Sequence, residues 1–297
     1  MPNSLPDFLI VGAAKSGTTT LHQLLKEHSD IYMPERKELN FWYTYGRDDW
    51  AILKRFPDLP KSLEDYLTYF DTDKKIKGEA SPGYLAYHTE TIQNIKALYP
   101  NYQALKIIII LREPIAKIWS HFKMVERAKM DPDGYNLWNS LKNEEKRKDN
   151  KKYLLDTLPL FSTDYLTQVK AFKANFEQVQ VLLFDDLVAS PQEVLNEITT
   201  FLEVSPLVLE PTSTNNKYNA APPKAFPNNI VLESLRKIGL NKLFSSGLKE
   251  KIVKRWTREK PMDKRTKKLL INRYKEDVKE LQDLIDQDLS SWLKKYN

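Results

Sequence analysis

Side chains able to bind a phosphate group are concentrated near the start of this 297-residue chain. Residues 12–20 read GAAKSGTTT, follow the apolar run 8–11, and precede leucines at helical spacing. A loop leading from a strand into a helix presents free N–H groups and the positive end of the helix dipole to an anion. We therefore predict a phosphate site in this loop, in preference to an ordinary glycine turn with a surface lysine. Its residues are Lys15, Ser16, Gly17, Thr18, Thr19 and Thr20.

The position of the lysine distinguishes this loop from the ATP-binding Walker A motif. Gly12 and Gly17 have the GxxxxG spacing, but Thr18 stands where that motif has lysine, and the lysine here is Lys15. A P-loop kinase also needs an aspartate at the end of a following strand, where this chain has Arg112. An ATP- and magnesium-dependent kinase is therefore the less favoured alternative.

Two segments together resemble the sulfotransferases that use 3′-phosphoadenosine 5′-phosphosulfate (PAPS). Residues 12–20 resemble the loop of that family that binds the 5′-phosphosulfate. Residues 107–122, IIIILREPIAKIWSHF, resemble its 3′-phosphate-binding segment, in which an arginine at a strand end acts with a serine eight residues later. The resemblance assigns these roles to Arg112 and Ser120, since a guanidinium can meet two phosphate oxygens and a hydroxyl a third. The structural alternative is a salt bridge from Arg112 and a surface hydroxyl at Ser120.

A third segment is similar to the heparan-sulfate-type branch of the family. Residues 77–84 read KGEASPGY, and in that branch the glutamate is the proposed catalytic base. The resemblance makes Glu79 the candidate base and Tyr84 a candidate substrate contact, the alternative for Glu79 being a carboxylate that only orders Lys15 or a loop. Lys15 would stabilise the departing phosphate. His121 is a secondary candidate base for which a helix-packing role is favoured.

A fourth segment resembles the Lys-Glu-x-x-Phe-Phe stretch of the same branch. Residues 34–42 read PERKELNFW, with Trp42 in place of the second phenylalanine. The resemblance places Lys37 near the reacting sulfonate or the acceptor, the alternative being a solvated charge. Phe41 and Trp42 are expected in the core or the pocket wall.

The resemblance implies an enzyme that transfers a sulfuryl group directly from PAPS and releases adenosine 3′,5′-bisphosphate. The acceptor would be a hydroxyl or an amine of a glycan or a small molecule. No metal is expected, because lysine and loop amides would take the charge that magnesium takes in a kinase. The alternative from another class is a non-catalytic relative that keeps the nucleotide site.

Hydrophobic periodicity indicates repeated strand-then-helix units. The run 105–111 is aliphatic apart from Lys106, as is typical of a parallel strand buried on both faces. We predict an α/β, three-layer, P-loop-like fold, with a central, mostly parallel sheet flanked by helices, in a single domain 1–297 with a helical extension from about residue 230. Expected strands are 8–11, 31–33, 76–79, 105–111 and 179–184; expected helices are 18–27, 61–70, 91–99, 165–176, 193–202, 263–292 and one beginning at Pro114.

Two segments depart from this alternation. Residues 141–152 are almost all charged and polar, which favours a solvated loop or helix end. Residues 206–229 are rich in Pro, Asn, Ser and Thr, and the length favours a lid. Lys217 and Lys224 fall where the family has a basic loop over the nucleotide, although the Lys-Gly-Arg triplet often found there is missing.

Composition excludes several kinds of chemistry. With no cysteine, disulfides, thiolate nucleophiles and Cys-ligated metals are excluded, and four histidines without an HExxH pairing do not favour a metal site. The net charge of +6 favours anionic partners but is too small to indicate nucleic acid. Without an apolar run of membrane-spanning length or a signal peptide, we expect a cytoplasmic protein, of bacterial type.

Overall fold

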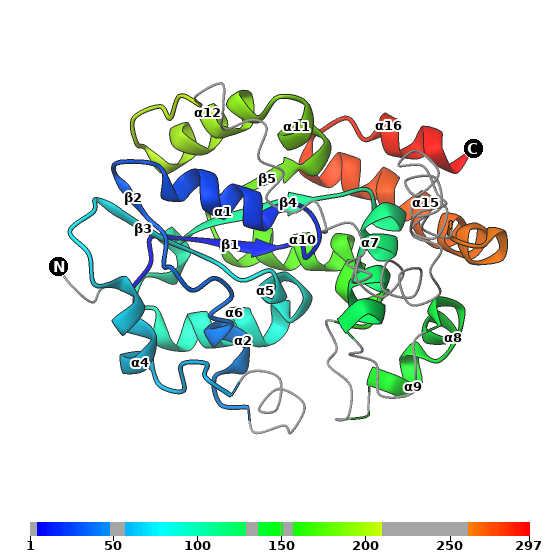
Figure 1. Cartoon of the computed structure of the whole chain (residues 1–297), viewed down its shortest axis with the longest axis horizontal. Helices are drawn as coiled ribbons and strands as arrows, with labels where there is room; N and C mark the ends of the chain where they lie inside the picture. Colours follow the sequence, from blue (N-terminus) through cyan, green and yellow to red (C-terminus); the bar gives the residue numbers. More distant parts are fainter. Residues whose placement is uncertain (1–4, 48–56, 129–135, 149, 151–156, 210–260) are drawn as a thin grey trace, which may run out of the picture.

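A single five-stranded parallel sheet forms the centre of the molecule (Figure 1). The computed structural model describes residues 5–47, 57–128, 136–148, 150, 157–209 and 261–297. The strand order is β2-β3-β1-β4-β5, and every pair is parallel. The strands are β1 (Phe8–Gly12), β2 (Ile31–Tyr32), β3 (Ile76–Ala80), β4 (Lys106–Leu111) and β5 (Val179–Leu183).

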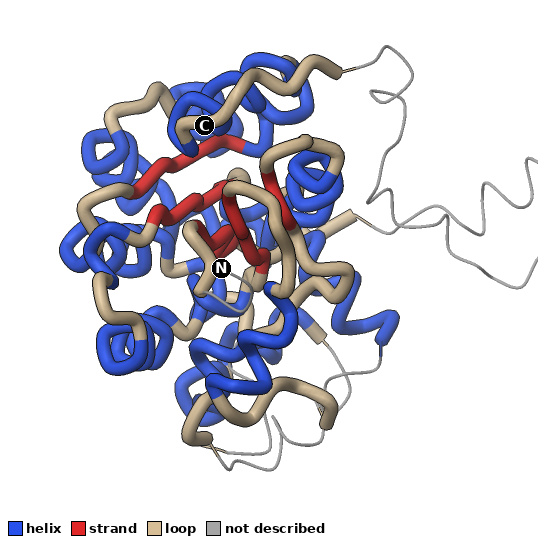
Figure 2. Tube along the Cα trace, turned by 90° about the vertical axis from the view of Figure 1, so that its left-hand side faces the viewer, coloured by secondary structure: helices blue, strands red, loops and turns tan. Residues whose placement is uncertain are grey.

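Helices cover both faces of this sheet, so the strands lie in the interior (Figure 2). On one face pack α1 (Thr18–Lys26), α11 (Phe184–Ala189) and α12 (Pro191–Leu202). On the other are α2 (Phe41–Thr44), α4 (Leu63–Leu67), α5 (Gly83–Ala86), α6 (His88–Leu98), α7 (Pro114–Ala128), α8 (Leu137–Lys142), α10 (Tyr165–Asn175), α15 (Lys264–Ile285) and α16 (Ser290–Leu293). Helix α9 is Glu144–Lys148, and the described ranges also contain the 3-10 helices η1 (Thr68–Phe70), η2 (Tyr102–Ala104), η4 (Phe161–Thr163) and η7 (Lys294–Tyr296).

The apolar strand β4 explains why the core has two halves. Ile108 and Ile110 point to the face covered by α1 and α12, whereas Ile107, Ile109 and Leu111 point to the face covered by α6, α10 and α15. Successive side chains of a strand point to opposite faces, so a strand covered on both sides is apolar at every position. The predicted α/β class with a central parallel sheet and helices on both faces is confirmed.

The strand order brings three loops to one edge of the sheet. β1 lies between β3 and β4, and Leu9 is paired with Glu79 on one side and with Ile107 on the other. Because the strands are parallel, the loops that follow β1, β3 and β4 leave from the same edge. Lys15 lies in the loop after β1 and Arg112 directly after β4, while Glu79 lies near the end of β3, just before the third loop.

Most of the expected elements are present, with boundaries shifted by a few residues. The stretch 61–70 forms the short helix α4 followed by η1. The buried stripe expected in 263–292 is present in α15 and beyond it, and α15 ends where Asp286 takes a left-handed conformation, with φ 53°. None of the helices in the described ranges combines the length and apolar character required to span a membrane.

The expectation for residues 141–152 was wrong in part. Instead of a solvated loop, the described part of this stretch forms the end of α8 and all of α9, and it buries Glu144 and Arg147. Glu144 accepts hydrogen bonds from the backbone N–H groups of Leu160 and Phe161, which a charged sequence pattern alone does not reveal. The expected lid, from residue 210 onward, lies outside the described residues.

Candidate anion-binding and active site

The loop between β1 and α1 is shaped for an anion. Lys15 and Gly17 both have left-handed backbones, with φ 67° and 92°. A Cβ added at Gly17 would lie 3.0 Å from side-chain carbons of Phe184 and Leu187, and residues other than glycine rarely adopt this φ, so glycine is favoured at the turn. Helix α1 has no side-chain cap and no acidic residue in its first turn. Its first N–H groups are therefore available to an anion.

Arg112, which follows β4, is tied to this loop. Its Nη1 donates a hydrogen bond to the backbone oxygen of Lys15 at 3.1 Å, and its guanidinium lies 4.7 Å from the centre of the Phe184 ring. Two acidic residues could pair with Arg112. Glu113 instead accepts hydrogen bonds from backbone N–H groups at the start of α7, and Asp185 accepts one from the indole of Trp292 in α16. Arg112 is thus oriented by the loop and a ring, and its charge is directed at the loop.

The electrostatics of the loop also favour an anion. Burial lowers the pKa of Lys15, and the positive charges of Arg112, Arg127 and Lys37 lower it further, with Glu38 opposing them. Burial is the largest cause of the lowered pKa, and the further effect of the three cations reflects a positive local potential. A bound phosphate or sulfonate would relieve that repulsion.

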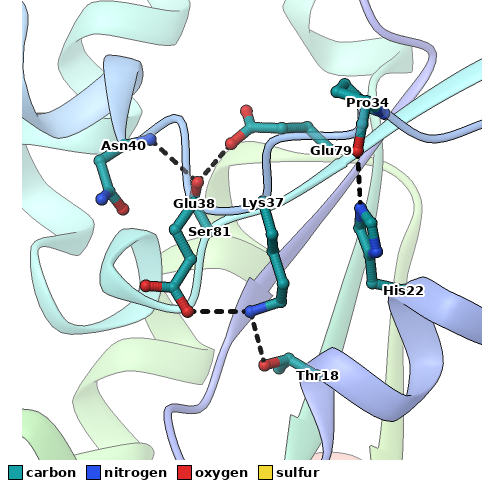
Figure 3. Close-up of polar contacts among 8 residues, drawn as sticks. All are labelled: Thr18, His22, Pro34, Lys37, Glu38, Asn40, Glu79 and Ser81. Atoms are coloured by element: carbon teal, nitrogen blue, oxygen red, sulfur yellow. Dashed lines mark hydrogen bonds and ion pairs between the residues drawn. The ribbon is translucent and has the colours of Figure 1, made fainter. Parts of the chain in front are cut away.

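Lys37 joins the same loop, as Figure 3 shows. Its Nζ donates to Glu38 Oε1 at 2.9 Å and to Thr18 Oγ1 at 3.4 Å. This contact places the Lys37 ammonium beside Thr18, the first residue of α1. Glu38, next to it and exposed, is a carboxylate at the loop that the sequence analysis did not consider.

Glu79 lies at the end of β3, buried within a cage of hydroxyl groups. Its carboxylate accepts hydrogen bonds from Ser81 Oγ, from Tyr66 at 2.7 Å, and from Tyr84 at 3.0 and 2.8 Å. Burial raises the pKa of Glu79, while the three hydroxyl groups and the charge of Lys37 act in the opposite direction. A carboxylate with a raised pKa is suited to exchanging protons near neutrality.

A second layer of contacts holds the cage in place. The indole of Trp42 donates to the Tyr66 hydroxyl at 3.1 Å, and the Asn40 N–H donates to Ser81 Oγ at 3.0 Å (Figure 3 shows the latter). Phe41 stacks on Tyr66 with ring centres 4.6 Å apart. Phe41 and Trp42 therefore form the wall behind Glu79, as expected, and Tyr66 is the member of the cage that the sequence analysis missed.

Helix α7 contributes Ser120 and His121. Ser120 is half-buried, in the second turn of the helix that follows Arg112. His121 is buried, and its pKa is well below the ordinary value because of burial and the nearby charges of Lys117 and Lys15. A neutral, buried His121 fits the helix-packing role. Lys217 and Lys224, the predicted contacts in the late loop, lie outside the described residues.

The fold and the site together define a class of protein. It is a parallel α/β protein with a cationic strand-loop-helix anion site and, one strand away, a buried carboxylate with a raised pKa. An anionic group held at the loop would lie beside a potential base, which is an arrangement for group transfer.

The comparison with family models identifies the family. The model described as "Sulfotransferase family" matches residues 6–207, more than half of the chain. The chain therefore belongs to the sulfotransferase family, and the family predicted from residues 12–20 and 107–122 is confirmed.

Similar proteins agree with this assignment. The chain is 29% identical over 147 residues to the membrane-associated sulfotransferase kil1 of Dictyostelium discoideum, covering 47% of this chain and 28% of that protein. It is 26% identical over 213 residues to the bifunctional heparan sulfate N-deacetylase/N-sulfotransferase 4 of Mus musculus, covering 68% of this chain and 23% of that protein. The chain thus spans about a quarter of the length of these two curated relatives.

A solved structure is similar along nearly the whole chain. The sulfotransferase from Alicyclobacillus acidocaldarius is 26% identical, with a TM-score of 0.71, and the match covers 97% of this chain and 99% of that one. The α/β fold described above is therefore a sulfotransferase fold.

Proposed function

We propose that this protein transfers the sulfuryl group of PAPS to a hydroxyl or an amine of an acceptor. The observation that carries the proposal is the hydrogen bond from Arg112 to the backbone of Lys15. It joins two segments 97 residues apart into one cationic site. A nucleotide with phosphate groups at both its 3′ and 5′ positions is the ligand that such a pair of segments fits.

The described residues fit this donor on two counts. Helix α1 begins without a side-chain cap, so its N–H groups are open to a 5′-phosphosulfate. Within the described ranges no ion pair joins Arg112 to Glu113 or Asp185, whose carboxylates accept hydrogen bonds from other groups, so its guanidinium can serve a 3′-phosphate. The residues proposed to hold the nucleotide are Lys15, Ser16, Gly17, Thr18, Thr19, Thr20, Arg112 and Ser120, with Lys217 and Lys224 as further candidates.

The proposed reaction is one in-line displacement. The acceptor oxygen or nitrogen forms a bond to sulfur as the bond from sulfur to the 5′-phosphate oxygen breaks, and the electron pair of that bond stays on the phosphate. Lys15 stabilises the charge that develops there, so that this role needs no magnesium. Lys37 is placed to contact the sulfonate.

Glu79 is the proposed base that takes the proton of the acceptor. Both of its oxygens accept hydrogen bonds from hydroxyl groups of the cage, so an acceptor must take the place of one of them. Tyr84, which contacts both oxygens, is the proposed neighbour of the acceptor. The raised pKa of Glu79, caused by burial, supports the role.

A glycan is the acceptor class that the relatives favour. The mouse relative and a human relative, heparan sulfate glucosamine 3-O-sulfotransferase 5, which is 24% identical over 209 residues, carry heparan sulfate in their names. A small-molecule alcohol or amine is the alternative class of acceptor, and the sulfur-35 transfer experiment below distinguishes the two classes.

Calorimetry tests the donor. We expect adenosine 3′,5′-bisphosphate to bind and ATP with magnesium to bind far more weakly, because ATP has no 3′-phosphate for Arg112. The reverse preference would replace the proposal with a kinase.

Transfer of sulfur-35 from labelled PAPS to a panel of polysaccharides and small alcohols or amines then tests the reaction. We expect Glu79→Gln to abolish transfer while adenosine 3′,5′-bisphosphate still binds. An unchanged rate would remove Glu79 from the mechanism, and no transfer by the unmodified protein to any acceptor would favour a non-catalytic nucleotide-binding protein.

A further inference from the structure

Tyr296, after α16, contacts the residue that follows Arg112. Its hydroxyl donates a hydrogen bond to Glu113 Oε1 at 2.5 Å, and both side chains are buried. The two residues are 183 positions apart in the sequence. A buried tyrosine aimed at a buried carboxylate is a specific contact, because each group would be costly to bury without the other.

Glu113 in turn fixes the start of α7. Its Oε1 accepts the N–H of Ile115 at 2.9 Å, and its Oε2 accepts the N–H of Ala116 at 2.7 Å. These bonds determine how the chain turns from β4 into α7. Arg112 is the residue immediately before this turn, so the orientation of its guanidinium depends on the geometry that Glu113 holds.

Trp292 makes a similar hydrogen bond, to the residue that follows Phe184. Its indole donates to Asp185 Oδ2 at 3.0 Å. Asp185 follows Phe184, the ring against which the Arg112 guanidinium lies at 4.7 Å. Tyr296 therefore holds Glu113, the neighbour of Arg112 in the sequence. Trp292 holds Asp185, the neighbour of Phe184.

These two side chains come from a segment that is itself firmly attached. α15 packs against α7 and α10, and Gln287 Nε2 donates to the backbone oxygen of Val181 in β5 at 2.7 Å. Figure 1 shows α15 and α16 beside the ends of β5 and α7. Burial and the adjacent Glu113 raise the pKa of Tyr296, so its hydroxyl stays protonated and able to donate.

We propose that Tyr296, supported by Trp292, is a positioning residue that holds Arg112 in the orientation that receives the 3′-phosphate. This inference rests on the proposed function, because it assumes that Arg112 binds that phosphate. It predicts an effect confined to ligands that carry a 3′-phosphate.

The test compares two nucleotides that differ only in this group. Adenosine 3′,5′-bisphosphate and adenosine 5′-monophosphate are titrated into the unmodified protein, Tyr296→Phe and Trp292→Phe. We expect Tyr296→Phe to weaken binding of the bisphosphate about five- to tenfold, less than the loss of a direct hydrogen bond to a charged group because Tyr296 acts on Arg112 through Glu113, and to leave binding of the monophosphate unchanged. Trp292→Phe should weaken the bisphosphate in the same selective way.

The matched control is Tyr99→Phe, because the Tyr99 hydroxyl also makes one hydrogen bond, to the backbone of Pro6 at 3.1 Å, ahead of β1 and away from Arg112. It should change neither affinity. Equal weakening of both nucleotides by Tyr296→Phe, or no weakening, would overturn the inference. If the unmodified protein does not prefer the bisphosphate, the proposed 3′-phosphate site is wrong, whatever Tyr296 does.

Discussion

At the scale of single residues, Lys15 is the group whose charge should respond most directly to the proposed nucleotide. Burial and the neighbouring cations lower its pKa in the free protein, so part of the population loses its proton at alkaline pH below the ordinary lysine range. A bound phosphate favours the ammonium form and raises that pKa again. Binding and protonation of Lys15 are therefore coupled.

We predict that adenosine 3′,5′-bisphosphate takes up protons as it binds at alkaline pH, and that its affinity falls as the pH rises further. Calorimetry in buffers of different ionisation enthalpy measures the uptake. Lys15→Arg should remove it, because a guanidinium stays protonated. The same uptake in that variant would assign the titration to another group.

Tyr66 controls the acidity of Glu79 in a way that kinetics can detect. Its hydroxyl donates to Glu79 at 2.7 Å and lowers the pKa of that carboxyl, against the effect of burial. Tyr66→Phe removes this donor. The acid limb of the pH–rate profile should therefore move to higher pH, with the rate on the alkaline side largely kept.

The control for this experiment is Tyr69→Phe, three residues further along, where the hydroxyl contacts Arg36 and not Glu79. Its profile should match that of the unmodified protein. If Tyr66→Phe gives that same profile too, ionisation of Glu79 does not limit the rate. Tyr66→Phe also leaves the buried indole N–H of Trp42 without its hydrogen-bond acceptor, which should reduce the free energy of unfolding by about 1–3 kcal/mol.

At the scale of elements, Glu144 joins α9 to η4. Burial raises its pKa to about 7 from 4.5, although the N–H groups of Leu160 and Phe161 favour the ionised form. A carboxyl whose pKa is raised by folding stabilises the protein fully below the unfolded value, and this stabilisation is lost as the pH rises through the folded value. The relevant window is therefore pH 4.5 to about 7.

We predict that Glu144→Gln flattens the dependence of stability on pH across this window. Across this window the unmodified protein should lose on the order of 3 kcal/mol of its free energy of unfolding, since each unit of the shift in the pKa of Glu144 corresponds to about 1.36 kcal/mol. Urea unfolding of both proteins at about pH 5 and about pH 8 measures the difference. Parallel losses in the two proteins would contradict the assignment.

At the scale of the whole molecule, stability depends on the sheet being covered on both faces. Ile109 in β4 is fully buried, whereas Val188 in α11 is 65% exposed. Ile109→Ala should reduce the free energy of unfolding by about 2–5 kcal/mol, because it leaves a cavity at the centre of the sheet. Val188→Ala, the matched loss of apolar surface outside the core, should stay within about 0.5 kcal/mol. Comparable effects of the two substitutions in urea unfolding would mean that this core half is not tightly packed.

Helices and strands could be predicted from the sequence where the pattern that indicates them lies within a few neighbouring residues. The mostly aliphatic run 105–111 predicted the buried strand β4, and leucines at helical spacing predicted α1, since both patterns arise from neighbours in sequence. The charged stretch 141–152 misled for the opposite reason. Glu144 can be buried because it accepts hydrogen bonds from the backbone N–H groups of Leu160 and Phe161. The pattern of charges along the sequence does not predict such distant partners.

The sequence by itself determined the loop of residues 12–20, the strand-then-helix order and the sulfotransferase family, because each is encoded by residues close together in the chain. Only the tertiary structure decided which side chains complete the site. Tyr66 donates to Glu79, Arg112 to the backbone of Lys15, and Tyr296 to Glu113. These contacts depend on the strand order and on where α15 and α16 pack, which are set by the burial of apolar faces across the whole molecule.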